Sequence, residues 1–174
     1  MNFSIIAAID KNRGIGIKGQ LPWRLKGDMD HFKAITTVAR PNTLNAVIMG
    51  YNTWISLPEK HRPLTDRLNI VLSWDKIELP DGVMYFDALD KALAWLEGRE
   101  DIDQVFIMGG ATLYKTSITH KLCHKLYLTE IDGSFECDTF FPEFDKNIFK
   151  KISESAPVDE AGVKYVYCEY EKDN

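Results

Sequence analysis

The sequence predicts an α/β protein in which helices cover both faces of a mainly parallel sheet. The first observation is a set of short, nearly all-apolar runs, which are typical of strands buried on both sides. These runs occupy Phe3–Ile9, 46–49, 68–72 and 105–108. The second observation is that segments with helical spacing of apolar residues lie between or after them, at 25–38, 88–96 and 111–117. Strands that alternate with helices favour parallel pairing.

The last part of the chain has a different pattern. We predict one strand over 126–129 and two more over Phe149–Glu154 and 163–170. Pro157 and Gly162 lie between the last two strands, and both residue types favour turns. These two strands are expected to form an antiparallel hairpin at the edge of the sheet, where one face meets solvent.

Composition indicates one globular domain that does not bind nucleic acid. Of the 174 residues, 45% are hydrophobic and 27% are charged, which suffices for a well-buried core. We expect residues 1–174 to form a single domain and a monomer. The net charge of −5 argues against nucleic acid as a partner, since such proteins normally carry a basic face. We interpret one local basic run as a solvated helix end and loop: Lys115, His120, Lys121, His124 and Lys125.

The cysteines and the hydropathy pattern indicate a cytoplasmic protein. Cys123, Cys137 and Cys168 are odd in number and fit no metal-binding spacing, so we expect separate thiols, a reducing compartment and no metal site. No segment resembles a signal peptide, and no apolar run approaches the ~20 residues needed to cross a bilayer, so no membrane partner is expected.

One acid stands out as a candidate catalytic group. Asp28 begins a predicted helix whose inward face also carries Leu25, Phe32 and Ile35. A carboxylate among apolar side chains is costly without a partner, and such acids occur often at functional sites. Burial should raise its pKa. The structural alternative is an acid that complements the helix dipole in the first turn.

Two glycine-rich segments follow predicted strands. Glycines at 14–19 suit a loop that passes close to a ligand or changes shape, and equally a mobile surface turn. Gly109-Gly110 ends a buried strand and opens a helix. Amides at a helix N-terminus attract phosphate, and open sheets bind ligands at the carboxyl ends of their strands. The alternative there is a tight strand-to-helix turn.

Two more segments are candidates for the same site. Leu21-Pro22-Trp23 places apolar side chains just before the helix of Asp28, where ordinary packing at a helix start is the alternative. Arg67 follows the loop 58–66 and precedes a strand, and a lone arginine is usually a surface charge.

These segments belong to a longer series of short motifs. The series is Ile5-Ile6-Ala7-Ala8, Gly14-Ile15-Gly16, Leu21-Pro22-Trp23, Asp28 with Phe32, Val47-Ile48-Met49-Gly50, Thr53-Trp54, Pro63-Leu64, Arg67, Ile107-Met108-Gly109-Gly110, Tyr114, Thr129 and Asp138-Thr139-Phe140-Phe141-Pro142. Each motif is weak alone. In this order and spacing, the series resembles the dihydrofolate reductase family over the whole chain.

The resemblance implies both an architecture and a reaction. The architecture is a central eight-stranded, mostly parallel sheet with an antiparallel C-terminal strand, helices on both faces and an adenosine-binding subdomain at about 43–93. The reaction is reduction of 7,8-dihydrofolate to 5,6,7,8-tetrahydrofolate by hydride transfer from NADPH, which supplies folate one-carbon metabolism. Antifolates such as methotrexate would bind at the substrate site.

The resemblance also implies roles for single residues. Asp28 would hold the pterin through a ring nitrogen and an amino group, and Thr129 would hydrogen-bond the acid. Trp23 would hold the water that passes the proton, while the loop that carries Leu21 closes over the nicotinamide. Arg67 would bind the α-carboxylate of the glutamate tail. The other implied substrate contacts are Ile6, Ala7, Phe32, Ile35, Leu57 and Met108. The implied cofactor contacts are Ala8, Ile15, Gly19, Asn52, Thr53, Ser73, Gly109, Gly110, Thr112 and Tyr114.

Two positions depart from the family pattern. Relatives usually carry basic residues that meet the 2′-phosphate of NADPH where this chain has Tyr51 and Trp74. Ser73, Asn52 and Lys76 would compensate in part. We therefore expect NADPH as the cofactor, with a smaller margin over NADH than is usual.

Two other functions stay open from the sequence. The first is another pterin or pyrimidine reductase of the same fold, which would give no reason for Asp28, Phe32 and Arg67 to occur together. The second is a pterin-binding protein without turnover, which is disfavoured because the acid, the loop and the glycine pair are all intact.

Overall fold

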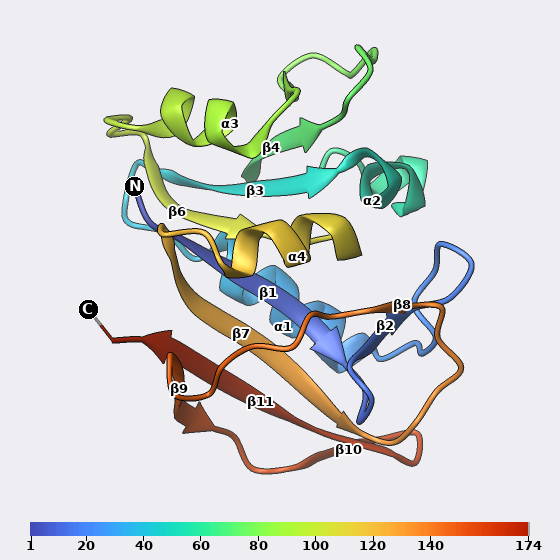
Figure 1. Ribbon diagram of the computed structural model, residues 1–174. Coiled ribbons are helices and arrows are strands. Elements are labelled where there is room, and N and C mark those ends of the chain that lie inside the picture. Colours follow the sequence, from blue (N-terminus) through green and yellow to red (C-terminus); the bar gives the residue numbers. More distant parts are fainter. Residues whose placement is uncertain (174) are drawn as a thin grey trace.

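The computed structural model describes residues 1–173, in which strands and helices alternate over most of the chain (Figure 1). The strands are β1 Phe3–Ile9, β2 Gly14–Gly16, β3 Leu44–Gly50, β4 Arg67–Leu72, β5 Met84–Phe86, β6 Ile102–Ile107, β7 Cys123–Asp132, β8 Thr139–Phe140, β9 Phe149–Glu154, β10 Val158–Glu160 and β11 Val163–Lys172. The helices are α1 Lys26–Thr37, α2 Tyr51–Ser56, α3 Leu89–Leu96 and α4 Ala111–Ile118, with a short 3₁₀ helix, η1, at Glu59–His61.

One sheet runs through the molecule in the order β10-β11-β7-β1-β6-β3-β4-β5, and β9 also pairs with β11. β9 and β10 occupy successive parts of one edge of β11, with Glu154 opposite Cys168 and Val158 opposite Tyr165. The order therefore has eight strand positions, the outermost shared by two short strands. β11 is antiparallel to its neighbours, whereas the strands from β7 to β5 pair in parallel. The predicted sheet architecture is confirmed, and so is the edge hairpin.

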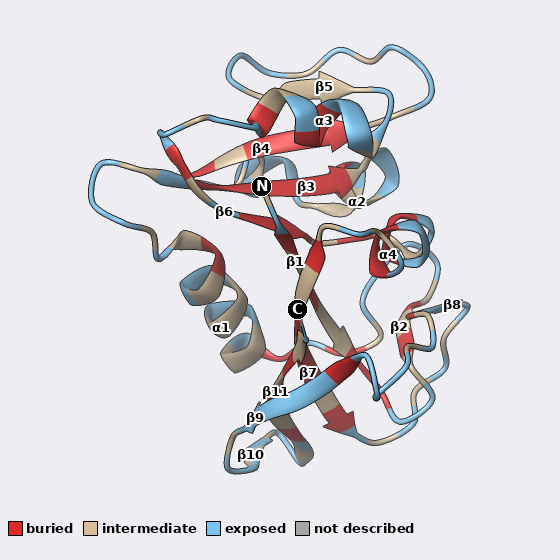
Figure 2. Cartoon of the chain, turned by 60° about the vertical axis from the view of Figure 1, so that its left-hand side comes forward, coloured by how far each residue is buried: buried red, intermediate tan, exposed pale blue. Residues whose placement is uncertain are grey.

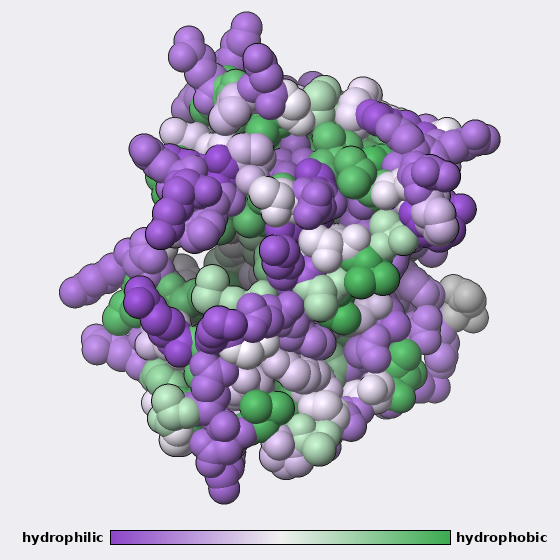
Figure 3. Space-filling model, turned by 180° about the vertical axis from the view of Figure 1, so that it is seen from behind, coloured by the Kyte–Doolittle hydropathy of each residue, from purple (hydrophilic) through white to green (hydrophobic). Residues whose placement is uncertain are grey.

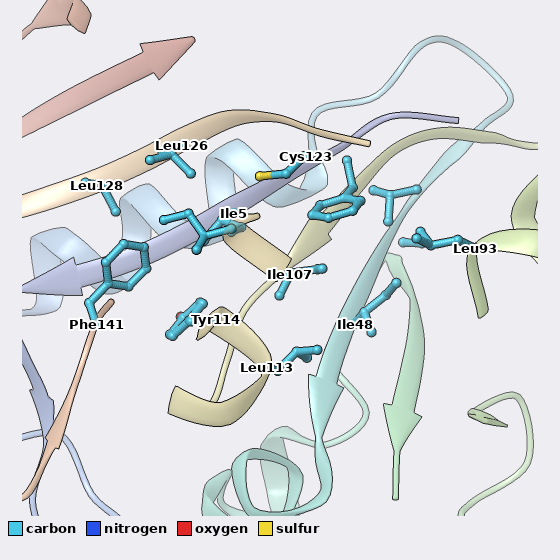
Figure 4. Packing of buried hydrophobic residues seen from close by; sticks show 14 of the residues in the cluster. Ile5, Ile48, Leu93, Ile107, Leu113, Tyr114, Cys123, Leu126, Leu128 and Phe141 are labelled. Atoms are coloured by element: carbon cyan, nitrogen blue, oxygen red, sulfur yellow. The ribbon is translucent and has the colours of Figure 1, made fainter. Parts of the chain in front are cut away.

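Side chains alternate between the two faces of the sheet and build a core on each. Ile5, Ile48 and Ile107 belong to one buried cluster with Leu113 and Tyr114 of α4 (Figure 4). Their neighbours along the same strands pack on the other face with partly buried residues of α1: Ile6, Val47 and Phe106 with Phe32 and Ile35. Helices thus cover both faces, with α4 in front of β1 and α1 behind it in Figure 1. The central strands are largely buried, whereas the outer loops are exposed (Figure 2).

Several short elements have no counterpart among the predicted ones. β2 pairs with β8 in a separate two-stranded sheet, and α2, β5 and β10 are also additional. Elements of two to six residues are too short to show a hydrophobic period, which is why the sequence pattern did not reveal them.

The interpretation of the basic run as a helix end and loop is wrong for two of its members. His124 and Lys125 lie within β7, where Lys125 pairs with Glu169 of β11 at 3.0 Å and His124 lies 2.9 Å from Glu171. The neighbouring antiparallel strand supplies acids to this end of β7, so these side chains pair across the sheet instead of being solvated.

The three cysteines are free thiols, two of them buried. Within residues 1–173, no cluster of His, Cys, Asp or Glu side chains has the arrangement of a metal site. The helices of this described part of the chain include none with the length and apolar character that a membrane span requires.

Candidate active site

Asp28 lies in the first turn of α1 and is hydrogen-bonded across to the sheet. Its Oδ1 accepts a bond from the Thr129 hydroxyl of β7 at 2.6 Å. Thr129 stands opposite Ala8 of β1, so the acid lies over the junction of these two parallel strands. Burial raises the pKa of Asp28, the Thr129 bond lowers it, and the negative charge of Glu160 raises it. Because burial is the largest of these causes, Asp28 retains its proton at a higher pH than an exposed aspartate does.

Most of the predicted ring-packing residues share one cluster. Phe32 lies one turn after Asp28 on the same face of α1, and Ile35 follows on the next turn. The predicted substrate residues in this cluster are Ile6, Phe32, Ile35, Leu57 and Met108. They come from β1, α1 and the ends of α2 and β6, so the fold gathers side chains that are distant in sequence. Ala7 is the exception, because it packs with the cluster on the opposite face of the sheet.

Arg67, the first residue of β4, is a buried cation with 8% of its surface exposed. Its Nε–H donates to the Thr65 carbonyl at 2.8 Å, and one terminal nitrogen donates to the Thr36 hydroxyl at 3.0 Å. Its guanidinium carbon is 5.8 Å from the centroid of the Phe32 ring. Burial lowers the pKa of Arg67, although a guanidinium stays charged in proteins. Its hydrogen-bond partners within residues 1–173 are neutral oxygens, so it keeps donors for a ligand carboxylate.

Trp23 lies between β2 and α1 and is buried. Its ring packs edge-on against Phe135 with centroids 5.3 Å apart. Among residues 1–173, its Nε1–H is the one buried side-chain polar group without a hydrogen-bond partner. An unsatisfied buried donor costs about 1–3 kcal/mol, so an oxygen atom from a small molecule is its expected partner. Leu21, two residues earlier, is exposed.

Gly109-Gly110 forms the turn from β6 to α4 and contains a cis peptide bond. Gly109 has a φ of 118°, and a Cβ added there would lie 3.3 Å from the Tyr114 ring. A Cβ on Gly110 would lie 3.3 Å from Thr53 Oγ1 of α2. The Gly50 N–H donates to the Gly109 carbonyl at 2.8 Å. The carboxyl ends of β3 and β6 therefore meet at a crowded point that suits glycine.

The Tyr114 hydroxyl is hydrogen-bonded to the backbone of β1. Tyr114 is buried, and its hydroxyl donates to the Ile6 carbonyl at 2.8 Å. Burial raises the pKa of Tyr114, so the hydroxyl stays protonated and remains a donor. The carbonyl of Ile6, a predicted substrate contact, therefore already accepts a hydrogen bond from the protein.

Asp10, which no sequence motif singles out, organises the loop after β1. It is 4% exposed; its Oδ1 accepts the N–H groups of Asn12 at 2.8 Å and Gly14 at 2.7 Å, and its Oδ2 accepts that of Phe135 at 2.9 Å. This carboxylate joins the β1–β2 loop to the β7–β8 loop. A Cβ on Gly14 would lie 2.4 Å from Cys137 Sγ, which explains that glycine by close packing.

A second contact between these loops lies nearer the surface. The Asp138 N–H donates to the Gly16 carbonyl at 2.9 Å, and the Lys18 N–H donates to the Asp138 carboxylate at 2.9 Å. The segment that leads to Trp23 is thus tied at two places to a loop that follows β7.

The positions discussed for the 2′-phosphate of the cofactor lie at the carboxyl ends of β3 and β4. Gly50 stands opposite Leu72, so Tyr51 and Ser73 follow neighbouring strand ends. Tyr51 is 39% exposed and Trp74 is 95% exposed. The remaining predicted cofactor residues lie in β1 (Ala8), β2 (Ile15), the following loop (Gly19), α2 (Asn52, Thr53) and α4 (Thr112).

The face seen from behind is hollowed, with hydrophobic surface in part of the wall of the hollow (Figure 3). A separate groove of about 500 Å³ lies between α3 and the segment before β7, and it is lined in part by Asp90, Leu93 and His120. This groove contains none of the predicted site residues, and it is distinct from the region around Asp28.

The fold and the site together define a class of protein. It is an open-sheet α/β protein with a half-buried carboxyl group beside an apolar wall that suits a planar ring, and with a glycine turn at the strand ends, where such sheets bind ligands.

Comparison with known proteins identifies the family. The sequence profile of the family described as Dihydrofolate reductase matches residues 2–172. The dihydrofolate reductase of Heliothis virescens is 45% identical over 181 residues, which cover 99% of this chain and 98% of the relative. That of Gallus gallus is 43% identical over 178 residues, covering 96% and 94%. The solved structure of Schistosoma mansoni dihydrofolate reductase has a TM-score of 0.88 and 37% identity, covering 99% of each chain. The chain belongs to the dihydrofolate reductase family.

Proposed function

We infer that this chain catalyses the reduction of 7,8-dihydrofolate to 5,6,7,8-tetrahydrofolate and so supplies folate one-carbon metabolism. The observation that carries this inference is the pair of Asp28 and Thr129, in which a half-buried acid with a raised pKa is held by a hydroxyl at 2.6 Å. One edge of dihydrofolate presents a ring nitrogen and an amino group side by side. A single carboxyl group matches both in a planar two-point contact.

Asp28 is suited to keep a proton available near neutral pH. The reduction adds a hydride to a ring carbon and requires a proton at the neighbouring ring nitrogen. A raised pKa increases the protonated fraction of the acid at the working pH. We propose that Trp23 binds the water that passes this proton, which would satisfy its unpartnered Nε1–H. The loop that carries Leu21 would close over the reacting rings and exclude bulk water.

The rest of the substrate would extend from this acid toward Arg67. Its rings would pack on the apolar cluster described above, with the backbone carbonyls of Ile6 and Met108 at the pterin edge and Ala7 as a further contact. Arg67 would bind the α-carboxylate of the glutamate tail through its remaining N–H groups. A buried guanidinium whose hydrogen bonds go to neutral oxygens is favourable for an anion, because a direct carboxylate partner would offset part of the cost of burying its charge.

NADPH is the cofactor that the family generally uses, and it supplies the hydride when bound. The glycine turn lies at the carboxyl end of β6 and opens α4, where backbone amides at a helix N-terminus would suit a phosphate. We propose that residues 43–93 form the adenosine-binding subdomain. The proposed cofactor contacts are Ala8, Ile15, Gly19, Asn52, Thr53, Ser73, Gly109, Gly110, Thr112 and Tyr114.

We further propose that the preference for NADPH over NADH is smaller here than is usual in the family. Tyr51 and Trp74 carry no charge, and both are open to solvent at the end of the sheet where the adenosine would bind. At such exposed positions a cation on the phosphate would contribute ~0.2–1 kcal/mol, so its absence narrows the preference modestly.

A steady-state assay with dihydrofolate and NADPH, paired with a fluorescence titration by methotrexate, tests the proposed function. We expect turnover, and methotrexate binding that competes with dihydrofolate. Turnover of another pterin or a pyrimidine, without turnover of dihydrofolate, would assign the chain to a different reductase of this fold. Competitive methotrexate binding without any turnover would make it a non-catalytic pterin-binding protein.

A further inference from the structure

Helix α1, which carries Asp28, has no N-terminal cap of its own. Its N-cap residue is Leu25, which offers no side-chain acceptor to the first amides. A residue 134 positions after Lys26 supplies that acceptor. Glu160 of β10 accepts the Lys26 N–H through Oε2 at 2.7 Å and the Gly27 N–H through Oε1 at 2.9 Å. The cap of this helix is therefore a carboxylate from the C-terminal hairpin.

The C-terminal hairpin forms hydrogen bonds with both the N–H and the carbonyl of Gly27, the residue directly before Asp28. The Tyr165 hydroxyl donates to Glu160 Oε1 at 3.0 Å, and the Tyr167 hydroxyl donates to the Gly27 carbonyl at 3.2 Å. A Cβ on Gly27 would lie 2.7 Å from the Tyr165 hydroxyl and 2.9 Å from Glu160 Oε1. A side chain at position 27 would thus displace the carboxylate, and glycine permits the approach.

We propose that Glu160 is a positioning residue for the reaction, because its carboxylate fixes the first turn of α1 and thereby sets the place and electrostatic surroundings of Asp28. This proposal rests on the proposed role of Asp28 as the acid. Glu160 touches neither the acid nor the expected ring position; it acts through the backbone of Lys26 and Gly27, and through its charge.

The charge of Glu160 acts on Asp28 in a defined direction. The groups that face Asp28 are the Thr129 hydroxyl of β7, Glu160 of β10 and Tyr167 of β11, whose ring stacks on His31 of α1 at 3.7 Å. The negative charge of Glu160 raises the pKa of Asp28. The bond from the Gly27 N–H lowers the pKa of Glu160 itself and so favours its ionised form. Removing this charge should therefore lower the pKa of Asp28.

Glu160→Gln tests the proposal, with Asp159→Asn on the same strand as the matched control, since Asp159 is exposed. The readout is the titration of the Asp28 side-chain carbon by NMR in ¹³C-Asp-labelled protein. Glu160→Gln should move the midpoint to lower pH, whereas Asp159→Asn should leave it in place. This readout does not depend on turnover, so it stays informative even if the chain fails to reduce dihydrofolate.

The pH profile of single-turnover hydride transfer should move in the same direction in Glu160→Gln. If Glu160 were only a structural cap, Glu160→Gln would lower the rate by the same factor at every pH. The midpoints of the NMR titration and of the pH profile would then both stay unchanged, and that result would overturn the proposal. Gly27→Ala provides a second variant that keeps the charge but displaces it. A lower midpoint in Gly27→Ala supports the proposal, and an unchanged midpoint in both variants refutes it.

Discussion

The substrate end and the nucleotide end of this site differ in how their side chains are held. Asp28 and Arg67 are withdrawn from solvent, and the protein itself binds each of them through a threonine hydroxyl. At the other end, Tyr51 and Trp74 follow strand ends and are exposed, Trp74 at 95%. The substrate end is therefore organised by contacts within the protein, whereas the nucleotide end is open surface.

This difference determines how strongly a substitution at each end should affect the protein. Desolvation at the substrate end shifts pKa values and strengthens each charge contact, so a substitution there should alter the chemistry strongly. Exposed side chains at the nucleotide end contribute little to folding and act through screened contacts. Substitutions there should therefore have small and salt-dependent effects.

The largest effect is expected from Asp28→Asn. We predict that kcat at pH 7 falls ~10²–10⁴-fold, because the amide keeps the shape of the acid but supplies no proton. Activity should recover in part at low pH, where solvent protonates the substrate. A kcat within about threefold of the wild type, well below that general-acid range, would remove Asp28 from the chemistry.

Thermal unfolding provides the control for this variant. Burial raises the pKa of Asp28 above its value in the unfolded chain, so the folded state loses stability as pH rises through the folded pKa. At neutral pH the asparagine variant should consequently unfold at the same temperature as the wild type or higher. A clearly lower unfolding temperature would mean that lost activity reflects a damaged fold.

Arg67→Leu should have the next largest effect, and mainly on binding. Removing one partner of a desolvated charge pair costs ~2–5 kcal/mol. The glutamate tail lies away from the reacting ring, so KM for dihydrofolate should rise far more than kcat falls. Steady-state kinetics measure both. An unchanged KM would place the tail on another basic residue.

Asp10→Asn tests the loop between β1 and β2. An amide nitrogen cannot accept an N–H, so one of the three backbone amides now bound by Asp10 loses its partner. The free energy of unfolding should fall by about 1–3 kcal/mol, as measured by urea denaturation, and kcat should fall with it. Asp138→Asn is the matched variant, because its carboxylate bonds to the Lys18 N–H at an exposed position and should cost less. Equal losses in the two variants would show that burial does not decide the effect.

Tyr51→Arg should have the smallest effect. A new exposed charge contact is worth ~0.2–1 kcal/mol, so Kd for NADPH should fall by about 1.5- to fivefold while Kd for NADH stays unchanged. Added salt should reduce the gain. Equal gains for both cofactors, or none for NADPH, would mean that position 51 does not face the 2′-phosphate.

The elements predicted from the sequence are those with a local pattern. The apolar run at Phe3–Ile9 coincides with β1, and the helical spacing at 111–117 differs from α4 by one residue. β2 and β8 are two short segments that pair with each other although they lie far apart in the chain, so no local period predicts them. The basic residues His124 and Lys125 were misplaced because their partners lie on β11, which the local pattern does not show.

The same division applies to the site. Asp28 and Gly109-Gly110 attract attention because their residue types are unusual at those points of a local pattern. Asp10 and Glu160 do not, because each acts on backbone amides far away in sequence: Phe135, 125 residues after Asp10, and Lys26, 134 residues before Glu160. A carboxylate that caps a distant segment looks in sequence like any surface acid.

The pH dependence of single-turnover hydride transfer, measured in the wild type and in Asp28→Asn, tests most directly the claim that a half-buried acid with a raised pKa provides the proton. The rate of the wild type should be high at low pH and should fall as pH rises through the pKa of Asp28, at a midpoint above the ordinary aspartate value. The asparagine variant should be slow and should lack that midpoint. The same midpoint in both proteins would show that another group titrates and would contradict the account.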